Sequence, residues 1–240
     1  MNPPSPLPAH ALYNQVRQRI STLWFIKSIG TIGWIAAFFV AYFWVLHHPM
    51  ADVTIMPLTA IDRLVPFRPE ALLLYASLWV YVSIAPALLK NFRELFSYGV
   101  ATLALSAIGL GIFLAWPTAV PPFEIDLTRH PSISVLRGVD LAGNACPSLH
   151  VAFAIFTGIW MDRVLREMHA NRGVLLLNWL WCLGIVYSTI ATRQHVLLDV
   201  MAGSILGAIV AVLHLAALRW YEQRATQTLA RRTVERVRGA

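Results

Sequence analysis

The chain has 240 residues, of which 58% are hydrophobic and only 13% are charged. Soluble domains usually carry about 25% charged residues, so this composition excludes an ordinary soluble globular protein. The formal net charge of +7 does not indicate nucleic-acid binding, because Lys and Arg gather in short segments between apolar runs and in the C-terminal tail, as membrane topology requires. The length suits a single helical bundle, and two cysteines offer neither a disulfide framework nor a metal cluster.

Six apolar stretches predict an all-α fold, namely a polytopic membrane protein with a bundle of six transmembrane helices. A span needs about 20 mostly apolar residues, and runs of this length without alternation are helical. The first run is too long for the apolar core of a signal peptide, so we expect it to be a retained span. The fourth is shortened by Asp162 and Arg163. The stretches are Trp24–Leu46, Ala71–Leu89, Phe96–Trp116, Leu149–Leu165, Val174–Thr192 and Val196–Leu218.

The distribution of basic residues predicts the orientation of these spans. With the N-terminus inside, 14 of the 19 Lys and Arg residues fall on the inner side and five on the outer side, which is a clear positive-inside bias. Residues 1–23 are therefore expected to form a cytoplasmic N-terminal segment, residues 24–219 the membrane domain, and residues 220–240 a basic cytoplasmic tail. The long loop Pro117–Pro147 then faces outward, and loops of this length are usually functional or mobile. Gly203 and Gly207 in the sixth stretch predict close helix packing.

A short motif, Cys146-Pro147-Ser148-Leu149-His150, opens the fourth stretch. Pro147 suits a helix start, where its missing N–H costs nothing. The free N–H groups of a helix start can bind an anion, and Ser148 adds a hydroxyl to them. His150 could protonate a leaving oxygen held by those donors. We expect Cys146, like Cys182 in the fifth stretch, to be an inert packing residue.

A second motif bridges the fifth and sixth stretches, from Ser188 to Asp199. His195 and Asp199 are four residues apart, so they share a helix face. The carboxylate can fix one tautomer of the imidazole and leave the other nitrogen to act as a base or nucleophile. Arg193 offers a planar donor fork that suits phosphate oxygens. The predicted topology places both motifs at the outer membrane face, and their combination indicates a catalytic site.

Two other interpretations stay open. His150, His195 and Asp199 form a set of two histidines and one carboxylate that could hold a divalent metal, although no metalloprotease spacing is present. A lipid transporter or an inactive scaffold is the alternative outside enzymology. Its intramembrane ionisable residues would be expected near the bilayer midplane, whereas here they stand at helix ends.

Both motifs resemble those of the type 2 phosphatidic acid phosphatase superfamily, which carries KxxxxxxRP, PSGH and SRxxxxxHxxxD. The second motif reads Pro147-Ser148-Leu149-His150 here, and the third keeps its spacing from Ser188 through His195 to Asp199. Thr189 stands where the third motif has Arg, and no KxxxxxxRP is present. With these departures, the two motifs resemble those of the branch that includes inositol phosphorylceramide synthases. The segment Asp62–Pro69, which Tyr75 follows, also resembles that branch.

The resemblance implies a membrane lipid-phosphate phosphatase or phosphotransferase that needs no metal or other cofactor. His195 would be the nucleophile that forms a phosphohistidine, Asp199 would orient it, and His150 would be the general acid and then the base. Arg193 and Ser148 would hold the phosphoryl oxygens. The missing first motif leaves phosphate binding short of cations, which Arg63, Arg68, Arg129 or Arg137 could supply.

The expected partners are a lipid phosphate in the membrane and water or an alcohol as acceptor, with no nucleic acid. The sequence identifies neither the lipid nor the acceptor, so head-group transfer of the inositol-phosphotransferase type stays open beside hydrolysis. It gives no oligomeric state. The expected location is the bacterial inner (plasma) membrane, with the active site facing outward.

Overall fold

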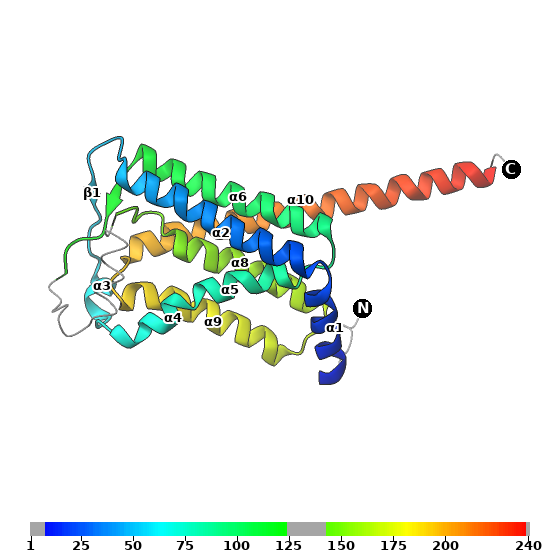
Figure 1. The fold of residues 1–240 in the computed structure, drawn as a ribbon, viewed down its shortest axis with the longest axis horizontal. Helices are drawn as coiled ribbons and strands as arrows, with labels where there is room; N and C mark the ends of the chain where they lie inside the picture. Colours follow the sequence, from blue (N-terminus) through cyan, green and yellow to red (C-terminus); the bar gives the residue numbers. More distant parts are fainter. Residues whose placement is uncertain (1–7, 124–142, 239–240) are drawn as a thin grey trace.

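The computed structural model describes residues 8–123 and 143–238, and its helices lie side by side in one bundle (Figure 1). Both described ends of the chain lie at the same end of this bundle, and α3 and β1 lie at the other (Figure 1). The helices are α1 (Ala9–Ser21), α2 (Trp24–His47), α3 (Ala60–Leu64), α4 (Leu72–Ala76), α5 (Leu78–Ala87), α6 (Phe92–Ala115), α8 (Leu149–Glu167), α9 (Arg172–Ala191) and α10 (Leu197–Arg238).

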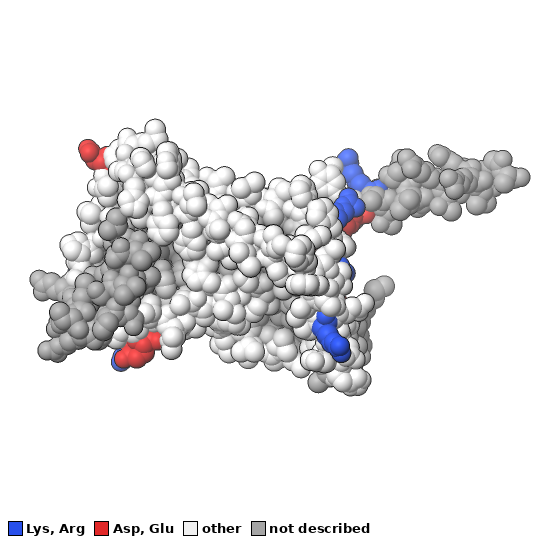
Figure 2. Space-filling model, viewed as in Figure 1, with Lys and Arg blue, Asp and Glu red and all other residues white. Residues whose placement is uncertain are grey.

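Five helical segments of the described chain are long and apolar enough to cross a membrane. This confirms a helical, multi-pass membrane protein. Charged side chains gather towards the two ends of the molecule, and the flank between them shows none on the face drawn in Figure 2. An uncharged belt of this kind is what a bilayer requires. The segments are Trp24–His47, Pro69–Ala87, Phe92–Ala115, Arg172–Ala191 and Leu197–Arg224.

The fourth predicted span, α8, is not among these five segments, but it is the central helix of the bundle. Ala152, Ala154, Phe156 and Trp160 are completely buried, and α8 contacts α5, α6, α9 and α10. A helix that neighbouring helices shield from lipid can carry polar residues that a lipid-facing helix cannot. A helix in this position can therefore be missed by a search based on hydropathy, although it belongs to the bundle.

Several predicted boundaries differ from those observed. The second stretch is broken into a 3-10 turn at Pro69–Ala71, followed by α4 and α5. The last stretch continues without interruption from the membrane domain into the tail as α10. The N-terminal segment contains a helix, α1, that the sequence analysis did not predict. The all-α description also misses two short parallel strands, β1 (Thr54–Ile55) and β2 (Thr118–Ala119).

The pair Gly203 and Gly207 brings α10 against α8, as the sequence predicts. A Cβ atom at Gly203 would lie 2.3 Å from the backbone oxygen of Ser148, and one at Gly207 would lie 2.2 Å from that of Ala152. Real Cβ atoms do not approach so closely, so only glycine allows this contact. The starts of α8 and α10, which carry the two motifs, are thereby held together.

Candidate active site

His150 and His195 lie far apart in the sequence but line the same cavity, of about 180 Å³. α8 and α10 begin at the end of the bundle opposite the two termini (Figure 1), and the two histidines of the cavity stand at these helix starts. The rest of the cavity wall is mainly aromatic and comes from α2, α4, α5, α8 and the segment before α8. The other lining residues are Phe38, Phe39, Tyr42, Phe43, Tyr75, Leu78, Trp79, Asn144, Leu149 and Phe153.

His195 stands just before α10, with Asp199 behind it. Nδ1 of His195 lies 3.5 Å from Oδ2 of Asp199, which is close enough for a charge interaction and longer than a good hydrogen bond. Asp199 is completely buried, and its Oδ2 also accepts a hydrogen bond of 3.0 Å from the Val196 N–H. Its Oδ1 has no hydrogen-bond partner among the described residues. A small rotation of His195 would complete the pair, and catalytic hydrogen bonds often tighten only when substrate binds.

His150 lies in the first turn of α8 and is fixed by aromatic contacts. Its ring stacks on Tyr75, with centroids 3.9 Å apart and planes 13° from parallel, and meets Trp79 edge to face. The backbone of Tyr75 also makes a hydrogen bond with the ring. Nε2 of His150 is buried and finds no protein partner within the described ranges. Buried polar atoms are normally satisfied, so this nitrogen is available to a bound ligand.

Ser148 is completely buried and caps α8. Its Oγ accepts a hydrogen bond from the Val151 N–H at 3.2 Å, and its own N–H donates to the backbone oxygen of Asp199 at 3.0 Å. An N-cap of this type typically contributes about 1 kcal/mol. Ser148 is not among the cavity's lining residues, so its observed contacts join α8 to α10.

Arg193 is likewise engaged outside the cavity wall. Its backbone is left-handed, with φ of 59°. Its guanidinium donates to the carbonyl oxygens of Asp62 and Val65, at 2.6 and 2.7 Å, and lies over the Phe123 ring. These contacts fasten the turn between α9 and α10 to α3. Of the five predicted site residues, the structure thus brings together His150, His195 and Asp199.

Asp62 is a buried carboxylate whose role the sequence analysis missed. Its Oδ2 accepts hydrogen bonds from the Thr59 N–H and hydroxyl, which caps α3. Its Oδ1 accepts a bond of 2.7 Å from the Leu197 N–H at the start of α10. The spacing Thr59-x-x-Asp62 is a capping-box signal that could have identified the first of these roles.

Cys146 behaves as a packing residue. Its N–H donates to Oγ1 of Thr118 on β2 at 2.7 Å, so the short sheet positions the start of the first motif. Burial raises the pKa of the Cys146 thiol to about 11, and the nearby Asp199 carboxylate acts in the same direction. A thiol that stays protonated at neutral pH is a poor nucleophile. Cys182 is also buried, in α9 against α8, where its Sγ contacts the backbone oxygen of Ala154.

The additional cations proposed from the sequence do not line this cavity where they are described. Arg63 and Arg68 are exposed and absent from the wall, and Arg129 and Arg137 lie outside the described residues. Within residues 8–123 and 143–238, no group of three or more His, Cys, Asp or Glu side chains is arranged to hold a metal ion. The metal-site alternative therefore gains no support from the arrangement of these side chains.

The comparisons with known proteins identify the family. The family model described as the PAP2 superfamily matches residues 90–224, which is more than half of the chain and includes both histidine motifs. Neither the curated proteins nor the solved structures gave a significant match. Membership suggests a phosphatase or phosphotransferase that acts on a phosphate ester. With two histidines of the expected spacing on one cavity and a family match over both motifs, the chain belongs to the PAP2 superfamily.

Proposed function

We propose that this protein is a membrane lipid-phosphate phosphatase or phosphotransferase that acts through a phosphohistidine on His195. The observation that carries the proposal is the shared cavity of His150 and His195, with the buried Asp199 carboxylate behind His195. A nucleophile, a proton donor and an orienting carboxylate are the groups that double displacement requires. The family match supports the reaction class.

The contacts support a division of labour between the two histidines. Once the His195 ring turns towards Asp199, the carboxylate holds a proton on Nδ1, so Nε2 keeps its lone pair and attacks phosphorus while the bond to the lipid oxygen breaks. His150 gives a proton to that oxygen as it leaves. In the second step His150 takes the proton from water or an alcohol, whose oxygen attacks the phosphohistidine and releases His195. The stack on Tyr75 keeps the His150 ring in place for both transfers.

The aromatic wall supports a lipid as the carrier of the phosphate. Phe38, Phe39 and Phe43 of α2 and Trp79 of α5 all line the cavity that holds the histidines. A hydrocarbon chain attached to the phosphate would be buried by these rings, whereas a soluble phosphate ester would gain nothing from them. The substrate class proposed is therefore a lipid phosphate.

We propose an orientation with six membrane crossings, made by the five segments given above and by α8. Both described ends of the chain lie at one end of the bundle (Figure 1), which requires an even number of crossings. The excess of basic residues on that side supports a cytoplasmic location for both termini. The histidine cavity then opens towards the non-cytoplasmic face, in a bacterial plasma membrane.

The acceptor is proposed to be water, with an alcohol as the alternative. The Cys146–His150 motif and the sequence Arg193-Gln194-His195 resemble the inositol phosphorylceramide synthase branch, which transfers a head group to a lipid alcohol. The segment Asp62–Pro69 shares that resemblance, and its carbonyl groups hold Arg193. This sequence likeness is the support for the alternative.

The test is an assay of the purified protein against a panel of lipid phosphates, with and without inositol and other alcohols. Release of inorganic phosphate would identify a phosphatase, and a phosphorylated alcohol would identify a transferase. His169→Asn is a suitable control, because His169 is exposed at the opposite end of α8 and Asn tolerates its left-handed backbone. Failure of the folded wild-type protein to turn over any member of the panel would favour a transporter or scaffold.

A further inference from the structure

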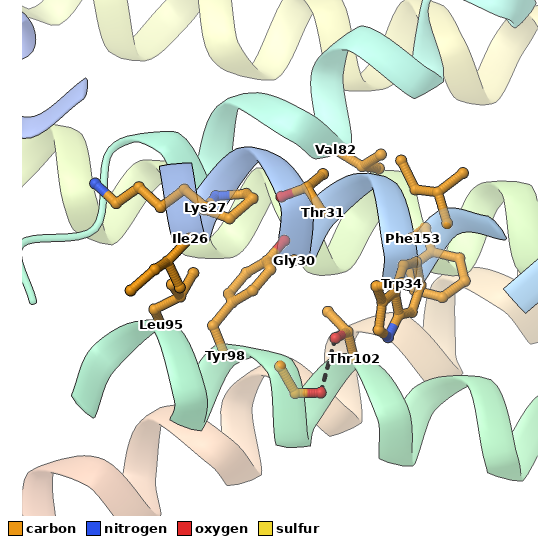
Figure 3. Close-up of a pocket in the computed structure, with 13 residues that line it drawn as sticks. Ile26, Lys27, Gly30, Thr31, Trp34, Val82, Leu95, Tyr98, Thr102 and Phe153 are labelled. Atoms are coloured by element: carbon orange, nitrogen blue, oxygen red, sulfur yellow. Dashed lines mark hydrogen bonds between the residues drawn. The ribbon is translucent and has the colours of Figure 1, made fainter. Parts of the chain in front are cut away.

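A second cavity lies beyond the histidine cavity, between α2, α5, α6 and α8. It measures about 170 Å³, and Figure 3 shows Lys27 at one end of it and Trp34 and Phe153 at the other. Its other lining residues are Ile26, Gly30, Thr31, Ile35, Val82, Pro86, Leu95, Tyr98, Gly99 and Thr102. None of the residues assigned to catalysis above belongs to this wall.

Two polar side chains of the second cavity, Lys27 and Thr102, already have hydrogen-bond partners in the protein. Lys27 Nζ donates to the backbone oxygens of Arg19, Ala87 and Leu89, at 2.6, 3.0 and 2.7 Å. The Thr102 hydroxyl donates to the backbone oxygen of Gly99 at 2.9 Å (Figure 3). The remaining wall is mainly aliphatic and aromatic, so the cavity suits an apolar occupant and offers little to a charged head group.

The two cavities meet at a cluster of three aromatic rings. Phe153 lines both cavities, Trp34 lines the second and Phe38 lines the first. The Phe153 ring meets Trp34 and Phe38 edge to face, each at 5.4 Å between centroids, and Trp34 stacks on Phe38 at 5.6 Å. Phe153 is the lining residue that the two cavities share, so a chain that ran from the histidines into the second cavity would pass this ring.

Together, the two cavities extend along α2 over a length greater than the thickness of one membrane leaflet. The two cavities are lined by α2 from Phe43 to Ile26, a stretch that rises by about 26 Å at 1.5 Å per residue. One leaflet is about half of a 30 Å hydrocarbon core. A chain attached to a phosphate at the histidines would therefore reach past the midplane before it filled the second cavity.

We propose that the second cavity binds the far part of the substrate's hydrocarbon chain, and that the protein selects lipid phosphates with a long chain. This inference rests on the proposed function and deepens it, because it names the substrate class. Phe153 separates the part of the chain next to the phosphate from the part that sets the length preference.

Two glycines permit a direct test. The Cβ of a side chain at Gly30 would have no atom within 4 Å, and the same is true of Gly33. Gly30 lines the second cavity, whereas Gly33, three residues further along α2, lines neither cavity. Gly30→Leu should therefore fill the cavity without distorting the helix, and Gly33→Leu is its matched control.

The measurement is kcat/KM for polyprenyl monophosphates of increasing length. We expect the wild type and Gly33→Leu to prefer long chains, and Gly30→Leu to lose about tenfold for every two methylene groups that leave the cavity. Short chains should be turned over equally by all three proteins. Equal length preference in Gly30→Leu and Gly33→Leu, with activity intact, would overturn the inference and leave the proposed function standing.

Photolabelling gives a second reading that needs no turnover. A long-chain lipid phosphate with a diazirine at the far end of its chain should label residues 26–35 and 95–102, and Gly30→Leu should abolish that label. Labels confined to the histidine cavity would overturn the inference. If residues 26–35 were labelled equally by an ordinary phospholipid with the same diazirine, the cavity would hold annular lipid and the inference would again fail. Specific labelling without hydrolysis would instead reject the proposed function alone.

Discussion

The two ends of the bundle both contain buried polar side chains, but these side chains differ in their hydrogen-bond and ion-pair partners. At the end that holds the termini, the Lys27 ammonium donates to three backbone oxygens, and Arg19 and Lys90 both pair with Glu167. At the other end, Nε2 of His150 and Oδ1 of Asp199 find no partner within the described structure. Buried polar groups that are satisfied stabilise a fold, whereas unsatisfied ones require an explanation such as a bound ligand. Towards the first end, Nη1 of Arg163 and Nδ1 of His214 also lack a hydrogen-bond partner, but neither residue lines the two cavities described above. The unsatisfied Nε2 of His150 belongs to a residue that lines a cavity, so we interpret the first end as structural and the second as reactive.

Loss of His195 should show this difference most strongly. His195→Ala removes the attacking nitrogen, so hydrolysis should fall by a factor on the order of 10⁴ or more, and no phosphoenzyme should form. The melting temperature should stay close to that of the wild type, because the His195 ring lacks a short hydrogen bond to Asp199. The measurements are phosphate release and acid-labile, base-stable radiolabel on the protein. Radiolabel on His195→Ala would assign the nucleophile elsewhere.

Loss of His150 should have a smaller effect that depends on the substrate. His150→Ala removes the proton donor of the first step and the base of the second, which typically costs about 10²–10⁴-fold. An aryl phosphate has a good leaving group, so its first step should largely survive and the phosphohistidine should accumulate. Rapid mixing with a labelled aryl phosphate would detect this intermediate. Wild-type turnover of a natural lipid by this variant would contradict the assignment.

Loss of Lys27 should lower the stability of the end that holds the termini, without changing the rate of the catalysed reaction. Lys27→Met keeps most of the side-chain volume but leaves three backbone oxygens without their donor. Each buried acceptor that is left unsatisfied costs about 1–3 kcal/mol, so the melting temperature should fall. The kcat for a short-chain lipid phosphate, corrected for folded protein, should change little. A normal melting temperature with reduced kcat would reverse the contrast between the two ends.

Gly203 tests whether the close contact of α8 and α10 serves the site. Gly203→Ala would place a Cβ 2.3 Å from the Ser148 oxygen, and Gly207→Ala would create the same clash against Ala152. Overpacking of this kind costs about 1–3 kcal/mol, so both variants should melt earlier. We expect only Gly203→Ala to lower kcat severalfold as well, because Ser148 also contacts Asp199. Gly33→Ala, which meets nothing within 4 Å, is the control.

The sequence predicted those features that depend on local pattern. Apolar runs identified the membrane helices, Gly203 and Gly207 their closest packing, and motif spacing the two histidines. Hydropathy did not show that α8 is shielded from lipid, because shielding depends on its neighbours. Nor did it show that Arg193 bonds to Asp62 and Val65, since this contact joins residues far apart in the chain. In the sequence, the aromatic wall on α2 was visible only as apolar residues; the fold brings it into one cavity with His150.

Cys146 should give the smallest effect, and one that depends on pH. Burial, followed by the nearby Asp199 carboxylate, raises the pKa of its thiol to about 11 from 9.0. Between these values the unfolded chain loses the thiol proton while the folded chain keeps it, so the folded state binds more protons and stability falls as pH rises. Below pH 9 the thiol is protonated in both states and contributes no slope. Cys146→Ala should therefore flatten the decline of stability between pH 9 and 11, and leave both the stability and the activity near pH 7 almost unchanged.

The measurement is the denaturant midpoint of both proteins at pH 7, 9 and 11. A steeper decline in the variant, or loss of turnover at neutral pH, would show that the thiol is ionised and does more than pack against Thr118 and its neighbours.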